Sequence, residues 1–276
     1  MGNLIKRSIT GILYIGVIVG CILWGNAGVL LLSLVFSALG VLEFEVLSDR
    51  NYSPRAILIY DIIGAMLLTF SIAMCYTTLP TESPLFMLLW LLWLLGRMTL
   101  ELYSREEDAL NHLCHSLTAQ VYIALPLGLM NLVNALSGGD VVLLMFILIC
   151  LNDTGAYVVG VSCGRHRLFE RISPKKSWEG FWGGMAFCIG GAIAAYYIVP
   201  GVFSSIMPIG FWVGYGVAVS VFATWGDLVE SMFKRTLGIK DSGHILPGHG
   251  GILDRIDSLL FVVPMTFVYL IIYMVV

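Results

Sequence analysis

One stretch of the chain, residues 231–257, carries most of the residue types that could do chemistry with a polyphosphate. It is the most polar, glycine-rich run in a chain that is elsewhere almost continuously apolar. Its fixed positive charges are Lys234, Arg235, Lys240 and Arg255, and its carboxylates are Asp241, Asp254 and Asp257. Carboxylate oxygens are the ligands that Mg²⁺ prefers, and cations neutralise phosphate. The stretch therefore predicts a site for a metal-bound polyphosphate.

Two features of this stretch sharpen the prediction. Asp254 and Asp257 are three residues apart, so on a helix they share one face, with Cβ atoms about 5–6 Å apart, and can share a cation. Before them, Pro247 and three glycines, Gly248, Gly250 and Gly251, bracket His249. Such a loop is tight, and its backbone can approach a ligand closely.

The spacing Ser, Lys-Arg, four residues, Lys-Asp, then Leu-Pro-x-His-Gly-Gly-x-x-Asp-Arg-x-Asp across residues 231–257 resembles the signature of phosphatidate cytidylyltransferases, also called CDP-diacylglycerol synthases. The match is long and combines uncommon residue types at fixed intervals, unlike a lone glycine-rich motif. Two shorter segments extend the resemblance, namely residues 153–157 (Asp-Thr-Gly-Ala-Tyr) and 173–180 (Ser-Pro-Lys-Lys-Ser-Trp-Glu-Gly).

This resemblance implies an enzyme that converts phosphatidate and CTP into CDP-diacylglycerol and pyrophosphate. It also implies Mg²⁺, a monovalent cation such as K⁺ beside it, and a homodimer. Nucleic acid is not expected among the partners.

Composition places the chain in a membrane. Of its 276 residues, 58% are hydrophobic and 12% are charged, and the mean hydropathy is +0.90, above that of soluble domains. Because a spanning helix needs roughly 20 apolar residues, the apolar runs predict an all-α polytopic protein with about nine transmembrane helices. The expected spans are residues 8–24, 28–47, 57–77, 84–102, 119–136, 141–161, 180–199, 206–229 and 258–276.

The basic residues orient these spans. With the N-terminus in the cytoplasm, all 15 Lys and Arg residues fall in connections on one side, and the alternate connections hold none. We therefore expect one integral membrane domain over residues 1–276, in a bacterial plasma membrane, with a cytoplasmic N-terminus, an external C-terminus and a cytoplasmic-face active site. The larger cytoplasmic connections are an interfacial amphipathic segment at 97–118, a loop at 162–179 and the signature loop at 230–257.

Several polar residues outside the signature have a structural and a functional interpretation. In the interfacial segment, His112, Cys114 and His115 could ligate zinc, but a satisfied interfacial histidine pair is favoured. Glu43, Glu45 and Asp61 are interpreted as interfacial helix charges and left out of the site.

The loop at 162–179 predicts an anion site. Ser173 before Pro174 is typical of a helix N-cap, which would place Lys175 and Lys176 in the first helical turn, beside unpaired N–H groups. The alternative is a plain positive-inside anchor, and the family resemblance of this segment favours function.

Asp153 lies about 12 Å inside the sixth span at 1.5 Å per residue, where an acid usually faces a polar cavity. A structural hydrogen bond through Asn152 or Asp153 is the alternative. In span eight, Asp227, then Glu230 or Ser231, then Lys234 form one helical stripe. Such a stripe can also serve only to hold helices together.

These residues fit the implied reaction. The attacking phosphate is already ionised, so positioning and charge neutralisation should dominate catalysis. We expect Asp227, Asp254 and Asp257 to hold Mg²⁺. Substrate phosphates would be neutralised or oriented by the remaining candidates, which are Lys175, Lys176, Ser231, Lys234, Arg235, Lys240, His249, Gly250, Gly251 and Arg255, with Asp153 lining the substrate site.

Two other functions use similar residues. A transporter of an anionic solute would also combine intramembrane acids with basic loops, but it would place them near the midplane in paired interrupted helices. CDP-alcohol phosphotransferases use Asp-x-x-Asp-Gly-x-x-Ala-Arg, whereas Asp257 is followed by Ser-Leu-Leu-Phe.

Overall fold

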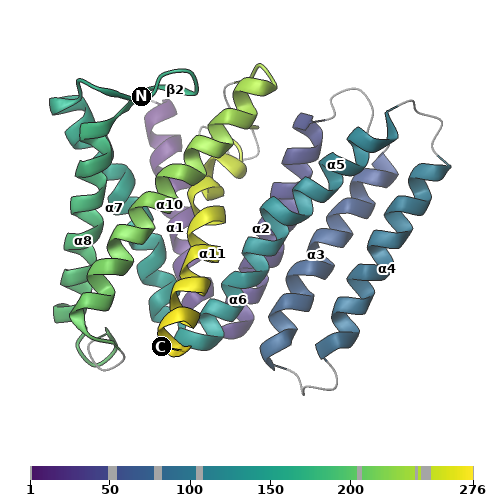
Figure 1. The fold of residues 1–276 in the computed structure, drawn as a ribbon, viewed down its shortest axis with the longest axis horizontal. Coiled ribbons are helices and arrows are strands. Elements are labelled where there is room, and N and C mark those ends of the chain that lie inside the picture. Colours follow the sequence, from purple (N-terminus) through teal and green to yellow (C-terminus); the bar gives the residue numbers. More distant parts are fainter. Residues whose placement is uncertain are drawn as a thin grey trace. The chain divides into compact units, whose positions relative to one another are not determined.

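A computed structural model of the chain describes residues 2–48, 55–77, 83–103, 108–203, 207–239, 242–243 and 250–275. These residues are almost entirely helical (Figure 1). The helices before the midpoint are α1 (Gly2–Leu23), α2 (Asn26–Ser48), α3 (Arg55–Thr77), α4 (Ser83–Leu102), α5 (Ala109–Ala119), the π-helix η1 (Gln120–Ala124) and α6 (Leu125–Ser137). The later elements are α7 (Gly139–Cys163), β1 (Arg167–Phe169), β2 (Ser173–Ser177), α8 (Trp178–Ile198), α10 (Ile209–Thr236) and α11 (Leu253–Val275).

The predicted spans are confirmed as helices. Eight helical runs in the described residues are long and apolar enough to cross a membrane, and a shorter apolar helix at Thr10–Leu23 matches the first predicted span. Because α5, η1 and α6 run on without a break, they count as one span, Ala109–Ser137. The protein is therefore an all-α, multi-pass membrane protein, to which the structure adds one short β-hairpin.

The predicted interfacial segment at 97–118 is divided between two helices. Its first residues complete α4, and residues 109–118 begin the run that continues through η1 into α6. Residues 104–107 lie outside the described residues. An interfacial location for the segment stays a prediction.

The chain divides into two compact units. The first comprises residues 1–136 and 241–255, and the second comprises residues 137–240 and 256–276. The sequence predicted a single membrane domain over residues 1–276. The first unit holds α1 to α6 and the approach to α11, whereas the second holds α7, the hairpin, α8, α10 and most of α11.

The first unit contains a buried charge cluster that joins α3, α4 and α5. Arg97 Nε lies 3.3 Å from Asp61 Oδ1, and Arg97 Nη1 lies 2.6 Å from Glu101 Oε2. Ser116 donates to Asp61 over 2.5 Å, and His112 Nδ1 lies 3.1 Å from Glu101. His112 is thus satisfied by a carboxylate, whereas His115 Nδ1 is buried without a hydrogen-bond partner among the described residues, so the favoured satisfied pair is confirmed only for His112.

Three acids that were expected to be interfacial charges are instead inside this unit. The side chains of Glu43, Glu45 and Asp61 are 3%, 3% and 0% exposed. That expectation was wrong because hydropathy locates a charge along a helix but not around it. Each carboxylate faces the protein interior, where hydrogen bonds and ion pairs such as those of Asp61 can offset the cost of burial.

The second unit is organised by close packing of α8 against α7 and α10. A side chain at Gly183 would overlap Val159 of α7, and one at Gly184 would overlap Asn152, so the glycines allow the two backbones to approach. Asn152 Oδ1 also accepts a 2.8 Å hydrogen bond from Ser220 of α10. The three helices are therefore tied together beside the hairpin that precedes α8.

Candidate active site

The hairpin β1–β2 carries the lysines of the second predicted motif. β2 pairs antiparallel with β1, with Arg167 opposite Ser177 and Phe169 opposite Ser173. α8 begins only at Trp178, and the Ser177 side chain accepts the Gly180 N–H over 3.1 Å as its N-cap. The predicted cap at Ser173 was therefore wrong, and Lys175 and Lys176 lie on a strand and not in a helical turn.

The cap prediction was wrong because two serines precede α8 and only Ser177 caps it. Ser177 precedes Glu179, which accepts hydrogen bonds from the backbone N–H groups of Arg165 and His166 over 3.0 and 3.2 Å. These bonds hold the base of the hairpin against the first turn of α8. Ser173 is kept in the extended partner strand, so it cannot cap a helix.

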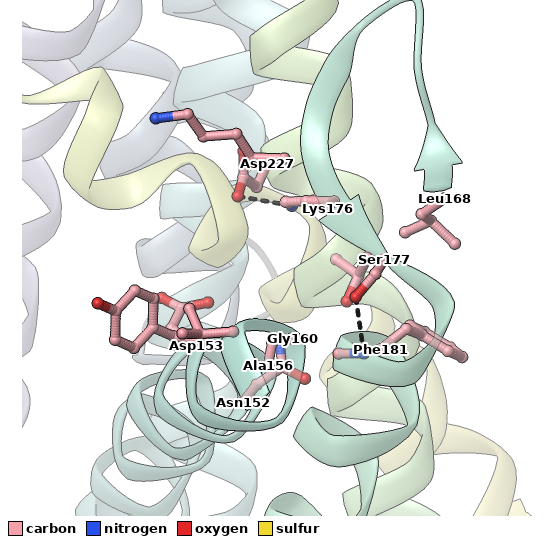
Figure 2. A pocket seen from close by; sticks show the side chains of 14 residues that line it. Asn152, Asp153, Ala156, Gly160, Leu168, Lys176, Ser177, Phe181 and Asp227 are labelled. Carbon is pink, nitrogen blue, oxygen red and sulfur yellow. Dashed lines mark hydrogen bonds and ion pairs between the residues drawn. The ribbon is translucent and has the colours of Figure 1, made fainter. Parts of the chain in front are cut away.

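Lys176 connects the hairpin to α10. Its Nζ lies 2.6 Å from Asp227 Oδ2, and both side chains are partly buried. The ion pair lies at a cavity of about 360 Å³ that Asp153 of α7 also lines. Figure 2 shows Lys176, Asp227 and Asp153 at this cavity. Lys175 lines it as well. Four of the residues predicted from separate segments are thus brought to one cavity.

The cavity has polar and apolar walls. Its polar lining includes Asn152, Ser177 and Thr224, whereas Val161 and Phe181 belong to its apolar lining. Since Asn152 is occupied by Ser220, the structural hydrogen bond considered for this segment is made by Asn152, and Asp153 contributes to the cavity. A cavity of this size and mixed lining suits a small-molecule ligand.

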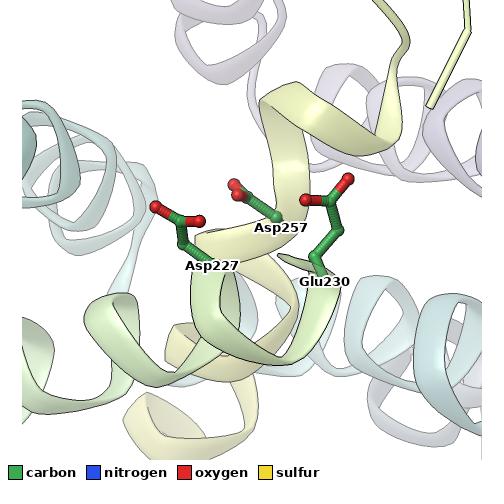
Figure 3. Close-up of side chains that lie close together, drawn as sticks. All are labelled: Asp227, Glu230 and Asp257. Atoms are coloured by element: carbon green, nitrogen blue, oxygen red, sulfur yellow. The ribbon is translucent and has the colours of Figure 1, made fainter. Parts of the chain in front are cut away.

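Next to the cavity, three carboxylates converge. Asp227 and Glu230 of α10 and Asp257 of α11 each offer an oxygen, and the three oxygens lie within 4.8 Å of one another. Figure 3 shows the side chains pointing to the same side of the two helices. Hard oxygen donors at this separation fit a divalent cation such as Mg²⁺. Asp227 belongs both to this acidic cluster and to the cavity.

Cationic and hydroxyl side chains surround the acidic cluster. Lys234 Nζ lies 2.5 Å from Glu230 Oε2, and Ser231 Oγ donates to Asp227 Oδ1 over 3.2 Å. The predicted stripe of α10 is confirmed, because residues four apart on this helix meet. Glu230, weighed against Ser231 for the stripe but left out of the site, proves to be a cluster member, and its spacing of three residues from Asp227 was the available signal.

Arg235 has a different contact from the one predicted. Its Nε donates to the carbonyl oxygen of Ile172 over 3.2 Å, so the end of α10 is attached to the turn of the hairpin. Arg255 is exposed in the first turn of α11. Lys240 and His249 lie outside the described residues, and their predicted roles stay predictions.

The two aspartates of the signature are both in the first two turns of α11, as predicted. Asp257 belongs to the acidic cluster. Asp254 accepts the backbone N–H groups of Ser242 and Gly251 over 3.1 and 3.0 Å. Gly250 has a φ of 84°, the left-handed conformation that favours glycine. Asp254 therefore holds the described residues that precede α11, at 242 and 251. Pro247, Gly248 and His249 of the predicted tight loop lie outside the described residues.

A residue that sequence reasoning left out also reaches this loop. Glu43 of α2 accepts the N–H of Leu253, the first residue of α11, through Oε2 over 2.8 Å. A glutamate within an apolar span was the available signal, since intramembrane acids are costly and usually have a specific partner.

Comparison with known proteins places these motifs in a family. The family model described as the cytidylyltransferase family matches residues 5–273, which is nearly the whole chain. The chain belongs to the cytidylyltransferase family. All the residues that line the cavity or belong to the acidic cluster lie inside the matched range.

Curated relatives within the family carry a more specific name. A phosphatidate cytidylyltransferase of Staphylococcus aureus (strain COL) is 46% identical over 132 residues, covering 47% of this chain and 48% of the relative. One from Staphylococcus epidermidis (strain RP62A) is 46% identical over 134 residues, with the same coverage. One from Staphylococcus saprophyticus is 44% identical over 150 residues, covering 52% and 55%. The matched part of this chain spans about half the length of these relatives.

Proposed function

We propose that this protein transfers the cytidylyl group of CTP to phosphatidate, giving CDP-diacylglycerol and pyrophosphate. The observation that carries the proposal is the ion pair between Lys176 and Asp227, which joins a lysine-lined cavity to a cluster of three carboxylates. Membership in the cytidylyltransferase family and the names of the relatives support the same reaction.

The chemistry requires little from a general base. A phosphate oxygen of phosphatidate attacks the α-phosphorus of CTP, and the bond from that phosphorus to the β-phosphate oxygen breaks, releasing pyrophosphate. Since the nucleophile is already an anion, the barrier lies in bringing it onto a polyanion, and positioning with charge neutralisation supplies most of the catalysis. Lys175 and Lys176 would hold phosphate groups at the cavity, and Lys234 would neutralise charge beside the acidic cluster.

The acidic cluster is the proposed Mg²⁺ site. Asp227, Glu230 and Asp257 would hold the ion, which when bound would offset negative charge on the CTP phosphates and on the leaving group. Asp254 is not a member of this cluster, and its predicted role as a metal ligand stays a prediction. K⁺ beside Mg²⁺ and a homodimer are proposed on the family resemblance alone.

The substrates suggest where the site lies. CTP is water-soluble and phosphatidate stays in the leaflet, so the site should open both to the cytoplasm and laterally to lipid. This agrees with the cytoplasmic N-terminus inferred from the basic residues. The bacterial relatives support a plasma-membrane location.

Two alternatives remain from the sequence. Anion transport is less favoured because the lysines of the cavity precede the start of α8 and the acids of α10 lie near the end of that helix, not at mid-span. A CDP-alcohol phosphotransferase is less favoured because its aspartate pattern does not continue after Asp257.

The test uses the purified full chain in micelles that contain phosphatidate and labelled CTP, with and without Mg²⁺. We expect the liponucleotide and pyrophosphate to appear in equal amounts and only with the metal. Asp257→Asn should lower the rate by about 10²-fold or more, as expected when a group that stabilises transition-state charge is lost.

Asp140→Asn is the matched control, since Asp140 is an exposed acid in the first turn of α7, away from the cluster, and its rate should not change. Folded wild-type protein that forms neither product would contradict the proposal, and anion flux into liposomes would then be measured.

A further inference from the structure

We propose that Glu43 of α2 is a positioning residue. It holds the loop before α11, of which the structure describes residues 242–243 and 250–252, and the first turn of that helix in their working arrangement. The inference rests on the proposed cytidylyl transfer. It gives that site a positioning residue, Glu43, whose backbone partner Leu253 lies 210 residues away in the chain. Glu43 is a positioning residue and not a catalytic one. It acts through the backbone that carries Asp254.

The first observation is the contact with the helix start. The N–H of Leu253 is one of the donors that a helix leaves without an internal partner, and Glu43 Oε2 accepts it over 2.8 Å. A carboxylate is also the favoured charge at this helix end, because the N-terminus carries a partial positive charge. Glu43 thus serves α11 as an N-cap supplied by a different helix.

The second observation is that the loop is shaped around this carboxylate. A Cβ added at Gly243 would overlap Glu43 Oε1, and one added at Gly251 would overlap both Glu43 Oε1 and Ser242 Oγ. Two glycines of the loop therefore leave the space that the Glu43 side chain occupies. An ordinary side chain at either position would push the loop away from α2.

The third observation links Glu43 to a predicted site residue. Asp254 accepts the N–H groups of Ser242 and Gly251, which belong to the same loop that Glu43 contacts. Glu43 holds this loop from α2, and Asp254 holds it from α11. A shift of Glu43 would therefore change the position of Asp254, and a displacement of about 1 Å at an active site can cost about 10²-fold in rate.

The burial of the Glu43 carboxylate indicates a role other than packing. Glu43 is 3% exposed inside a helix that is otherwise strongly apolar. Burying a carboxylate is costly unless hydrogen bonds compensate it, and an apolar residue would fill the same volume without that cost. An apolar residue could not accept a hydrogen bond from the Leu253 N–H.

The test compares Glu43→Ala and Glu43→Gln with Asp61→Asn in the full chain. Glutamine keeps the shape and an acceptor oxygen, whereas alanine removes both. Asp61 is a matched control, because it is a fully buried carboxylate of the first unit that bonds Ser116 and Arg97 and not the loop. Three readouts are taken, namely thermal unfolding in detergent, hydrogen exchange of peptides covering residues 250–256, and kcat and KM as functions of Mg²⁺.

We expect Glu43→Ala to speed exchange near Leu253 and to lower kcat by about 10²-fold, with a higher Mg²⁺ requirement. Glu43→Gln should recover most of the kcat. Asp61→Asn should lower the unfolding temperature without changing exchange near Leu253 or the Mg²⁺ response. Unchanged exchange and kinetics in Glu43→Ala, or the same kinetic loss in Asp61→Asn, would overturn the inference.

Two precautions keep the result decisive. If Glu43→Ala does not fold, Gly243→Ala displaces the loop while leaving the carboxylate in place, and it should show the same faster exchange and reduced kcat. If wild-type protein makes no CDP-diacylglycerol, the proposed function fails, but the exchange measurements still decide whether Glu43 holds the loop.

Discussion

At the scale of single residues, opposite charges are paired within the proposed site. Lys176 contacts Asp227, and Lys234 contacts Glu230, so two of the three clustered carboxylates already face an ammonium group. A substrate phosphate or a metal ion entering here would exchange one set of charge contacts for another. The lysines can then turn toward phosphate without leaving a carboxylate uncompensated, provided that a cation takes their place.

Lys176→Met tests the part of this exchange made at the cavity. The change keeps most of the side-chain volume and removes the charge, so we expect kcat/KM for CTP-dependent transfer to fall by about 10²-fold. Arg171→Met, which removes an exposed cation elsewhere on the hairpin turn, is the control and should have little effect. Equal losses of kcat/KM in both variants would indicate a general effect of charge on the hairpin.

Glu230→Gln tests the residue that sequence reasoning omitted from the acidic cluster. Removing one carboxylate from a group of three hard-oxygen donors should raise the Mg²⁺ concentration for half-maximal rate by about tenfold or more, as for other changes around metal sites. The measurement is a Mg²⁺ titration at saturating CTP, compared with Asp140→Asn. An unchanged titration curve would remove Glu230 from the proposed metal site.

At the scale of elements, the β-hairpin decides how the lysines are presented. A helical first turn would have put Lys175 and Lys176 beside helix N–H groups, whereas the strand directs Lys176 toward α10. The strand ends at Ser177, whose side chain caps α8, and Arg235 attaches the end of α10 to the hairpin turn. The hairpin is therefore held by both neighbouring helices.

The cap assignment gives a paired prediction. Ser177→Ala removes the hydrogen bond to Gly180 and should cost about 1 kcal/mol of stability, whereas Ser173→Ala should cost little because Ser173 caps no helix. The apparent unfolding temperature of the two variants in the same detergent measures the difference. A larger loss from Ser173→Ala would restore the helical interpretation of residues 173–176.

The buried charge cluster of α3, α4 and α5 gives a second prediction at this scale. Arg97→Met would leave Asp61 and Glu101 buried without their shared cation, and loss of one partner from a buried ion pair costs about 3–5 kcal/mol. Arg55→Met, at the exposed start of α3, is the control. The yield of folded protein and the unfolding temperature should fall only for Arg97→Met.

At the scale of the whole molecule, orientation in the membrane links the site to its substrates. The basic residues predict that the hairpin faces the cytoplasm and that the turn between α6 and α7 faces outward. In a cysteine-free variant, Arg167→Cys should react with a membrane-impermeant maleimide only in inverted vesicles. Asp140→Cys should react in intact cells, and the reverse pattern would contradict the proposed topology. Both positions are exposed.

The sequence by itself determined the features that depend on local rules. Apolar runs of about 20 residues predicted the spans because only a helix of that length crosses the hydrocarbon core with its backbone satisfied. Spacing of three and four residues predicted the stripe of α10 and the place of Asp254 and Asp257 on α11, because helical neighbours follow from periodicity. The signature spacing was enough to indicate the family.

Only the tertiary structure decided which of these residues meet. Lys176 and Asp227 are 51 residues apart in the chain, and Glu43 and Leu253 are 210 apart. Such contacts depend on which face of each helix is buried, which hydropathy does not report for a span that is apolar all round. For the same reason Glu43 and Glu230 were left out of the predicted site. The cap signal at Ser173 was also overridden, because Ser173 pairs with Phe169 in the β-hairpin and Ser177 takes the cap of α8.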